Sequence, residues 1–188
     1  MRPGFASFGL PTTKAIVVTT VFGLAGLAGF ITSRDAEGSL PHMLFGAVLI
    51  VNTYFSVRFF SAITPAGNRV QQIVDGCLVV EYLLLACSFG HSGYFLLVGG
   101  ALFLTAMGKY AHLNRLILYP RTIRRKFIID MLGLLLFIVG AIIELFNRGV
   151  AAWTIAIAFL LANVYLLVIN PMYVSRDFVA DRPSSSLP

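Results

Sequence analysis

Six long apolar stretches, separated by short polar joints, dominate this chain of 188 residues. A helix that crosses a bilayer needs roughly 20 mostly apolar residues, and each stretch is about that long. The joints contain residues that commonly end helices, for example Pro65 and Gly67 after the second stretch and Gly90 after the third. The predicted membrane spans are 14–32, 41–63, 70–90, 93–113, 126–146 and 150–170.

The composition agrees with a protein that is nearly all membrane. Hydrophobic residues make up 58% of the chain and charged residues 12%, whereas a soluble domain carries about 25% charged residues. A water-soluble globular protein is therefore excluded, and six spans leave no length for a soluble catalytic domain. We expect an all-α fold, a single six-helix transmembrane domain over residues 1–176, and a disordered cytoplasmic tail over 177–188.

The positions of the basic residues predict the orientation. If both termini face the cytoplasm, all Lys and Arg residues except Arg34 and Arg148 lie on or near the cytoplasmic side, as the positive-inside rule requires. We expect a multi-pass protein of a bacterial inner membrane or an organelle membrane. The basic segment carries no aromatic stacking platform, so the net charge of +6 does not indicate nucleic acid. An anionic-lipid headgroup site is the alternative use of its residues Arg121, Arg124, Arg125 and Lys126.

A possible internal repeat links the cytoplasmic joints. Pro65, Arg69 and Asp75 recur 55 residues later as Pro120, Arg124 and Asp130. The interval suggests three helical hairpins, each entering from the cytoplasm. Proline and arginine are also common where helices end at a membrane interface. The match therefore does not decide whether the chain contains a true repeat.

Glu81 is the carboxylate that stands out, because it is predicted near the middle of the third span without a basic residue at its depth. Charged residues inside a membrane are expensive and mark functional sites by default. We expect Glu81 either to form a structural hydrogen bond to Asn52 or Asn163, or to line a substrate or ion path together with Asn52, Asn163 and Cys77. Cys77 lies one turn away on the same face.

Other polar residues within the spans have structural explanations. We expect the ion pairs Arg58–Asp75 and Lys109–Asp130, because each pair lies at similar depth on neighbouring spans. Two sets of residues are predicted as helix-packing seams, because small side chains on one face let helices approach closely. They are Gly23, Gly26 and Gly29 in the first span, and Gly133, Gly140 and Glu144 in the fifth.

Three functions remain compatible with these patterns. The first is a small transporter or channel-like protein that uses a mid-membrane carboxylate. The second is a non-catalytic accessory subunit of a membrane complex or a homo-oligomer, and the third is a lipid-modifying enzyme with acids near the interface. The sequence shows no phosphate-binding loop, nucleophile elbow or metal-ligand spacing, so we predict no catalytic residue, metal or cofactor.

Overall fold

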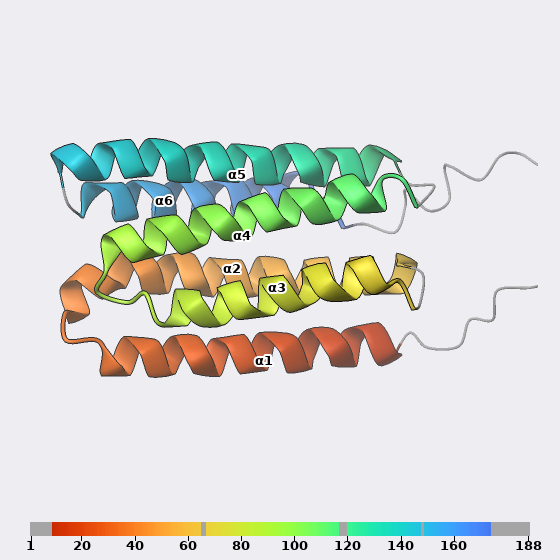
Figure 1. The fold of residues 1–188 in the computed structure, drawn as a ribbon, viewed down its shortest axis with the longest axis horizontal. Helices are drawn as coiled ribbons and strands as arrows, with labels where there is room; N and C mark the ends of the chain where they lie inside the picture. The colour runs from red at the N-terminus through yellow and green to blue at the C-terminus, as the bar shows by residue number, and fades with distance from the viewer. Residues whose placement is uncertain (1–8, 65–66, 117–119, 148, 174–188) are drawn as a thin grey trace, which may run out of the picture.

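A computed structural model describes residues 9–64, 67–116, 120–147 and 149–173, and within these ranges the chain is all helical. Figure 1 shows the helices lying roughly parallel to one long axis. They are α1 (Gly9–Thr32), α2 (Ala36–Ile63), α3 (Arg69–Ala86), α4 (Ser92–Leu113), α5 (Pro120–Phe146) and α6 (Val150–Val164), which continues into a short π-helix, η1 (Tyr165–Ile169).

The helices begin and end where the polar joints supply caps. The Asp35 carboxylate accepts a hydrogen bond from the Gly38 amide at 2.9 Å at the start of α2, and the Asn68 side chain accepts one from the Gln71 amide at 3.1 Å at the start of α3. Such side chains satisfy amides that the first helical turn leaves unpaired. Gly149 precedes α6 with a φ of 90°, a backbone conformation that favours glycine.

Five of the helical segments are long and apolar enough to cross a membrane, whereas α3 differs. The five are 11–32, 36–63, 92–113, 121–146 and 150–169. α3 has 18 residues, which span about 27 Å, and includes Arg69, Asp75 and Glu81. The helices are therefore compatible with a multi-pass membrane protein, but the predicted six spans are supported for five.

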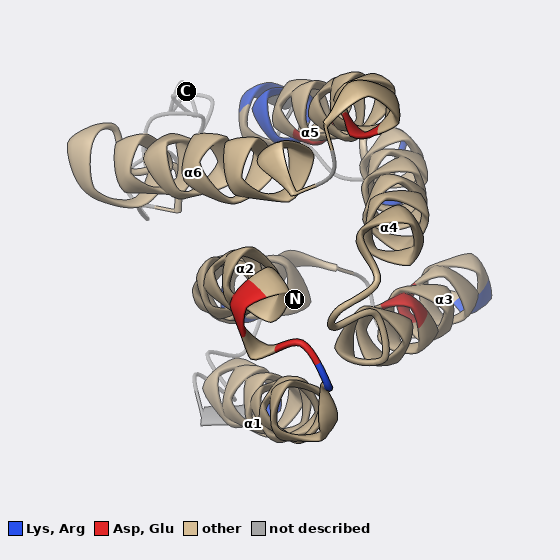
Figure 2. Cartoon of the chain, turned by 90° about the vertical axis from the view of Figure 1, so that its left-hand side faces the viewer, with Lys and Arg blue, Asp and Glu red and all other residues tan. Residues whose placement is uncertain are grey.

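The six helices form a closed ring. Neighbours in contact are α1 with α2, α2 with α6, α6 with α5, α5 with α4, α4 with α3, and α3 with α1. Figure 2 shows this order from one end of the molecule, with α2 displaced toward the middle. The starts of α1, α3 and α5 lie at the same end as the last turns of α2, α4 and α6. We call this the basic end, because Lys14, Lys109 and Arg121 lie near it.

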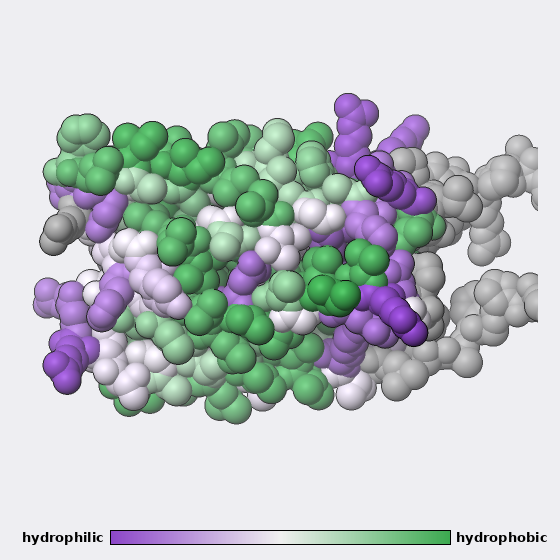
Figure 3. Space-filling model, viewed as in Figure 1, coloured by the Kyte–Doolittle hydropathy of each residue, from purple (hydrophilic) through white to green (hydrophobic). Residues whose placement is uncertain are grey.

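The face shown in Figure 3 is mostly apolar along the length of the helices, and most of its polar side chains gather toward the two ends. Large side chains such as Leu97, Leu145 and Val168 are more than two thirds exposed. A soluble monomer rarely exposes so much contiguous apolar surface, so this surface suits lipid. The structure contains no membrane, and the predicted orientation of the termini remains a prediction.

Aromatic rings form the buried core of the ring of helices. Phe45 of α2, Phe95 of α4 and Phe137 of α5 are each at most 2% exposed, and their centroids lie 5.2–5.5 Å apart. Edge-to-face and tilted contacts at this separation are favourable for aromatic pairs. This core lies between α2, α4, α5 and α6.

The glycines proposed as packing seams differ in their surroundings. A Cβ at Gly133 would lie 2.4 Å from the Phe103 ring of α4, and one at Gly140 would lie 2.5 Å from Ile155 of α6. α5 therefore approaches both neighbours closely at these glycines. In the same helix, Glu144 accepts a hydrogen bond from the Gly149 amide at 3.4 Å.

In α1, a Cβ at Gly29 would lie 2.0 Å from the Ala86 carbonyl oxygen. At Gly23 the nearest atom is 3.8 Å away, and at Gly26 nothing lies within 4 Å. The predicted seam in α1 is thus tight only at Gly29. The hairpin repeat stays a prediction, and the predicted tail 177–188 lies outside the described residues.

Candidate functional site

The inward face of α2 near the basic end is polar. Asn52 and Thr53 are buried, and Ser56 follows one turn later, so the three side chains lie on or beside one helical face. Ser56 and the Tyr110 hydroxyl of α4 lie 3.0 Å apart in a hydrogen bond. The Tyr173 hydroxyl donates to Asn52 Oδ1 at 3.3 Å, and burial raises the pKa of this phenol, which keeps its proton.

The inward face of α3 continues this polar surface. Gln71, Asp75, Leu78 and Tyr82 follow one another at intervals of three or four residues, so they share one face. The Gln71 amide nitrogen donates to Asp75 Oδ1 at 2.9 Å. Tyr82 lies deeper in the ring of helices, where its hydroxyl is hydrogen-bonded to Thr53 of α2.

Asp75 forms an ion pair with Lys109 of α4, in which Nζ lies 2.7 Å from Oδ1. The structure thereby corrects the predicted Arg58–Asp75 pair. α3 packs against α4 and α1, whereas α2 packs mainly against α1 and α6. Arg58 is an exposed residue of α2, so Lys109 is the base that reaches Asp75.

Asp130 forms an ion pair with Lys126, one turn earlier in α5, at an Nζ–Oδ1 distance of 2.5 Å. The predicted Lys109–Asp130 pair is thus also corrected. Lys126 is not the headgroup residue that its place in the basic segment suggests, because its side chain is 7% exposed and that of Asp130 is 1% exposed. α5 begins at Pro120 rather than at residue 126, so Lys126 lies well inside the helix.

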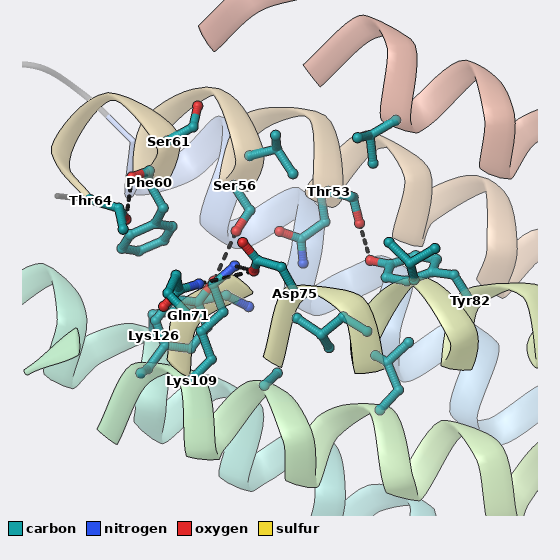
Figure 4. Close-up of a pocket in the computed structure, with 18 of the residues that line it drawn as sticks. Thr53, Ser56, Phe60, Ser61, Thr64, Gln71, Asp75, Tyr82, Lys109 and Lys126 are labelled. Atoms are coloured by element: carbon teal, nitrogen blue, oxygen red, sulfur yellow. Dashed lines mark hydrogen bonds and ion pairs between the residues drawn. The ribbon is translucent and has the colours of Figure 1, made fainter. Parts of the chain in front are cut away.

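These polar residues surround a cavity of about 390 Å³ between α1, α2, α3, α4 and α5, which we call the polar cavity. Figure 4 shows Gln71, Asp75, Lys109 and Lys126 gathered in one part of it, with Ser56 and Thr53 on the facing helix. Thr64, Gly67 and Asn68 of the α2–α3 connection also line it, so the cavity extends to the basic end. Ligand pockets of proteins measure about 300–1,000 Å³, so the polar cavity suits a small ligand.

Three lining oxygens have no hydrogen-bond partner within the described part of the chain. They are Ser61 Oγ, Gln71 Oε1 and Asp130 Oδ2, and all are buried. Buried polar atoms are nearly always hydrogen-bonded in folded proteins, to protein or to ordered water. The three unpartnered oxygens and the ammonium groups of Lys109 and Lys126 thus all belong to side chains of residues that line the polar cavity.

A pair of stacked aromatic rings closes the inner end of the polar cavity. The rings of Phe22 and Tyr82 have centroids 4.2 Å apart and an angle of 3° between their planes. A second cavity of about 260 Å³ lies beyond them, and Phe22, Leu49 and Tyr82 line both cavities. We call the second one the apolar cavity, because His42 and Tyr82 are its only polar side chains among the residues that the structure gives as its lining.

The structure does not bring together the four residues proposed as a substrate or ion path. Glu81 accepts a hydrogen bond from Thr105 of α4 at 2.7 Å and lines neither cavity. Cys77 is exposed. Asn52 lines the polar cavity, and Asn52 and Asn163 both line the third cavity described below. The Asn163 side chain donates a hydrogen bond to the Phe159 carbonyl one turn away at 2.8 Å. A bond to a neighbouring helix favours the structural interpretation of Glu81.

A third cavity lies between α5 and α6, with Arg121, Arg124 and Arg125 among its lining residues and an otherwise mostly apolar wall. The Arg125 guanidinium donates to the Asn170 carbonyl oxygen at 3.3 Å. Three of the four residues predicted to contact lipid headgroups thus lie together beside an apolar groove, and Lys126 is the exception.

Sequence reasoning missed the polar cavity because its parts are short polar side chains on different helices. Ser56, Gln71 and Tyr110 are unremarkable in the sequence. The signal that could have found them is the three- or four-residue spacing of Gln71, Asp75 and Tyr82, which places them on one face of α3.

Among the residues that the structure describes, no group of three His, Cys, Asp or Glu side chains could hold a metal ion. Comparisons of the chain with protein-family models, with curated proteins and with solved structures gave no match. The functional argument therefore depends on the geometry of the cavities.

Proposed function

We propose that this protein is a small membrane transporter that binds a polar solute in the polar cavity. The observation that carries the proposal is the placement of Lys109, Asp75, Lys126 and Asp130 around an open space inside the bundle. Lys109, Lys126 and Asp130 lie within helical segments that are apolar enough to cross a membrane. Charged residues inside such segments are costly, and they usually face a partner, a water-filled cavity or a substrate path.

The lining of the polar cavity supports a solute with both donors and acceptors. Each lysine ammonium has three N–H donors and uses one in its ion pair, so others can bind an anionic or carbonyl oxygen. The unpartnered Gln71 Oε1 and Asp130 Oδ2 can accept hydrogen bonds from an ammonium or amide group. A small zwitterion satisfies both sets, and the volume of about 390 Å³ suits a small molecule.

Transport also requires that the cavity open in turn to each side. The polar cavity extends to the basic end, and the stacked Phe22 and Tyr82 rings close it toward the opposite end. Release toward that end therefore requires these rings to move apart. The Tyr82 hydroxyl is hydrogen-bonded to Thr53 of α2. Movement of the Tyr82 ring is therefore coupled to the position of α2.

The test is uptake into liposomes that contain the purified full-length protein. The probes are radiolabelled neutral amino acids as zwitterions, with a small dicarboxylate and a small primary amine for comparison. We expect uptake of a zwitterion that Lys109→Met and Asp130→Asn each lower about tenfold or more, because loss of one hydrogen bond to a charged group costs about 1.5–3 kcal/mol.

The matched control is Glu81→Gln, which changes a carboxylate of the same bundle that lies outside the polar cavity. We expect its uptake to equal that of the unaltered protein. Uptake that is lost in Glu81→Gln and kept in Asp130→Asn would contradict the proposal. It would indicate that the solute path runs past Glu81 instead. Absence of uptake for every probe class would also contradict it.

A further inference from the structure

The apolar cavity is a second space, partly open to the surface, on the far side of the Phe22–Tyr82 pair from the polar cavity. α1, α2, α3 and α4 contribute to its walls. Aromatic rings of Phe30, Phe45, Phe89 and Phe95 line it, and the exposed side chains of Leu27 and Met43 form part of its rim. It therefore reaches the lipid-facing surface near α1 and α2, where a lipid-soluble molecule could enter.

His42 is the polar group that distinguishes this cavity. Its side chain lines the cavity and is 3% exposed, and its ring lies 4.3 Å from the Phe95 ring between centroids. Both ring nitrogens are buried, and neither has a hydrogen-bond partner in the described part of the chain. A neutral imidazole has one N–H donor and one acceptor nitrogen, so His42 can both donate and accept.

Two polar groups near this end of the molecule form hydrogen bonds with partners other than His42. The Asp35 carboxylate caps α2 through the Gly38 amide, and Ser39 is hydrogen-bonded to Ser33. Buried polar groups in folded proteins nearly always have partners. A lone buried imidazole beside an apolar space is therefore the arrangement expected where a ligand supplies the missing hydrogen bond.

Two glycines leave room for such a ligand. Gly26 of α1 and Gly46 of α2 both line the apolar cavity, and a Cβ at either would meet nothing within 4 Å. By contrast, Gly29 lies one turn from Gly26 and packs tightly against Ala86. The cavity thus has free space between α1 and α2, with aromatic walls that suit a flat ring.

We propose that the apolar cavity binds a lipid-soluble ring compound with a hydrogen-bonding oxygen, such as a phenol or a quinone. The ring packs against Phe45 and Phe95, and the oxygen forms a hydrogen bond with His42. A phenol donates to the acceptor nitrogen of the imidazole, whereas a quinone accepts from its N–H. The site is separate from the polar cavity, so it does not depend on the proposed transport.

The experiment measures binding of three matched probes to the full-length protein in nanodiscs: para-pentylphenol, pentylbenzoquinone and pentylbenzene. They share the ring and the chain and differ in the oxygen. We expect at least one oxygenated probe to bind about tenfold more tightly than pentylbenzene, the ratio expected for one net hydrogen bond. A phenol preference and a quinone preference both support the proposal and show whether His42 accepts or donates.

Three variants locate the binding. His42→Phe keeps a ring of similar size without nitrogens, and we expect it to remove the preference for the oxygenated probe. Gly46→Leu fills the cavity from the turn that follows His42 on the same face of α2, and we expect it to weaken all three probes. Gly108→Leu is the control, because Gly108 also has open space around its Cβ but lines neither cavity.

Equal affinity for the three probes in the unaltered protein would overturn the proposal. A preference for oxygen that persists in His42→Phe would overturn it as well, because the hydrogen bond would then be made elsewhere. Gly46→Leu keeps the test decisive if His42→Phe fails to fold: undiminished binding in Gly46→Leu would exclude the apolar cavity.

Discussion

The ring of Phe22 on α1 lies flat against the ring of Tyr82 on α3, with 4.2 Å between their centroids. This contact is the boundary between a polar cavity that extends to the basic end and an apolar cavity that extends toward the opposite end. Tyr82 is anchored by Thr53, whereas Phe22 is held by packing. The boundary therefore depends on side chains from three helices.

Removal of one ring should open the boundary. We expect Phe22→Ala to raise the passive leak of a small polar solute, such as glycerol, from liposomes that contain the protein, because the alanine removes the ring that lies between the two cavities. Leu24→Ala is the control, since Leu24 is 63% exposed on the outside of α1. An unchanged leak in Phe22→Ala would show that the two cavities are separated by more than this pair.

The Lys126–Asp130 pair should make a large contribution to stability. Breaking a buried ion pair by removal of one partner costs about 3–5 kcal/mol, because the other charge stays buried and uncompensated. We expect Asp130→Ala to lower the free energy of unfolding by about that amount, measured by denaturant titration in detergent micelles.

The double variant Lys126→Met/Asp130→Leu is the control for this prediction, since it removes both charges and should recover much of the loss. Asp75→Ala is a second comparison. The Asp75 side chain is 39% exposed, so solvent screens its pair with Lys109 and the loss should be smaller. Equal losses of unfolding free energy in Asp75→Ala and Asp130→Ala would contradict the difference in burial between the two ion pairs.

Glycine substitutions should separate tight helix contacts from open ones. A Cβ at Gly99 would lie 2.1 Å from the Phe137 ring, so Gly99→Ala forces α4 and α5 apart or moves the ring. Overpacking of this kind costs about 1–3 kcal/mol. Thermal unfolding should show a lower Tm for Gly99→Ala and none of this loss for Gly108→Ala, where nothing lies within 4 Å.

The positions of most helices could be predicted from the sequence, because apolar runs and capping residues are local signals. In the structure Asp35, Asn68 and Gly149 precede the first residues of α2, α3 and α6, and each lies in a polar joint between two apolar stretches. The starts of α1, α2 and α5 lie five or six residues before the predicted ones. In α5 the reason is that the first turns are rich in basic residues, which do not resemble a membrane span. Because α5 begins at Pro120, six residues before the predicted start at residue 126, Lys126 lies inside the helix, and its side chain is buried rather than at the surface.

The partners of the charged residues could not be predicted, because they depend on the order of helices around the ring. Neighbours in sequence suggested a contact of Arg58 with Asp75, but α3 packs against α4 and α1. The polar cavity is a property of five helices at once. Glu81 stood out in the sequence because it is charged. Its Oε1 accepts a hydrogen bond from Thr105, and its Oε2 is buried without a partner among the described residues, but Glu81 lines neither the polar nor the apolar cavity.

The arginines beside the α5–α6 groove should bind anionic lipid. We expect Arg121→Gln/Arg124→Gln to lower the amount of cardiolipin or phosphatidylglycerol retained by the purified protein in native mass spectrometry, because guanidinium groups pair well with phosphate. Arg34→Gln, at the opposite end of the molecule, is the matched charge control. Equal retention in all three proteins would exclude a specific headgroup site at this groove.

The most direct test of the central claim is whether water and small solutes reach the polar cavity from the basic end. The measurement is labelling of Ser56→Cys, in a chain whose Cys77 and Cys87 are replaced by Ser, with a membrane-impermeant thiol reagent applied to each side. Ser56 lines the cavity, and Leu104→Cys, whose parent side chain is 59% exposed on the outer face of α4, is the lipid-facing control. We predict that Ser56→Cys reacts from the side of the basic end only and that Leu104→Cys reacts from neither. A Ser56→Cys thiol that stays unreactive in a folded protein, or reacts equally from both sides, would contradict the account.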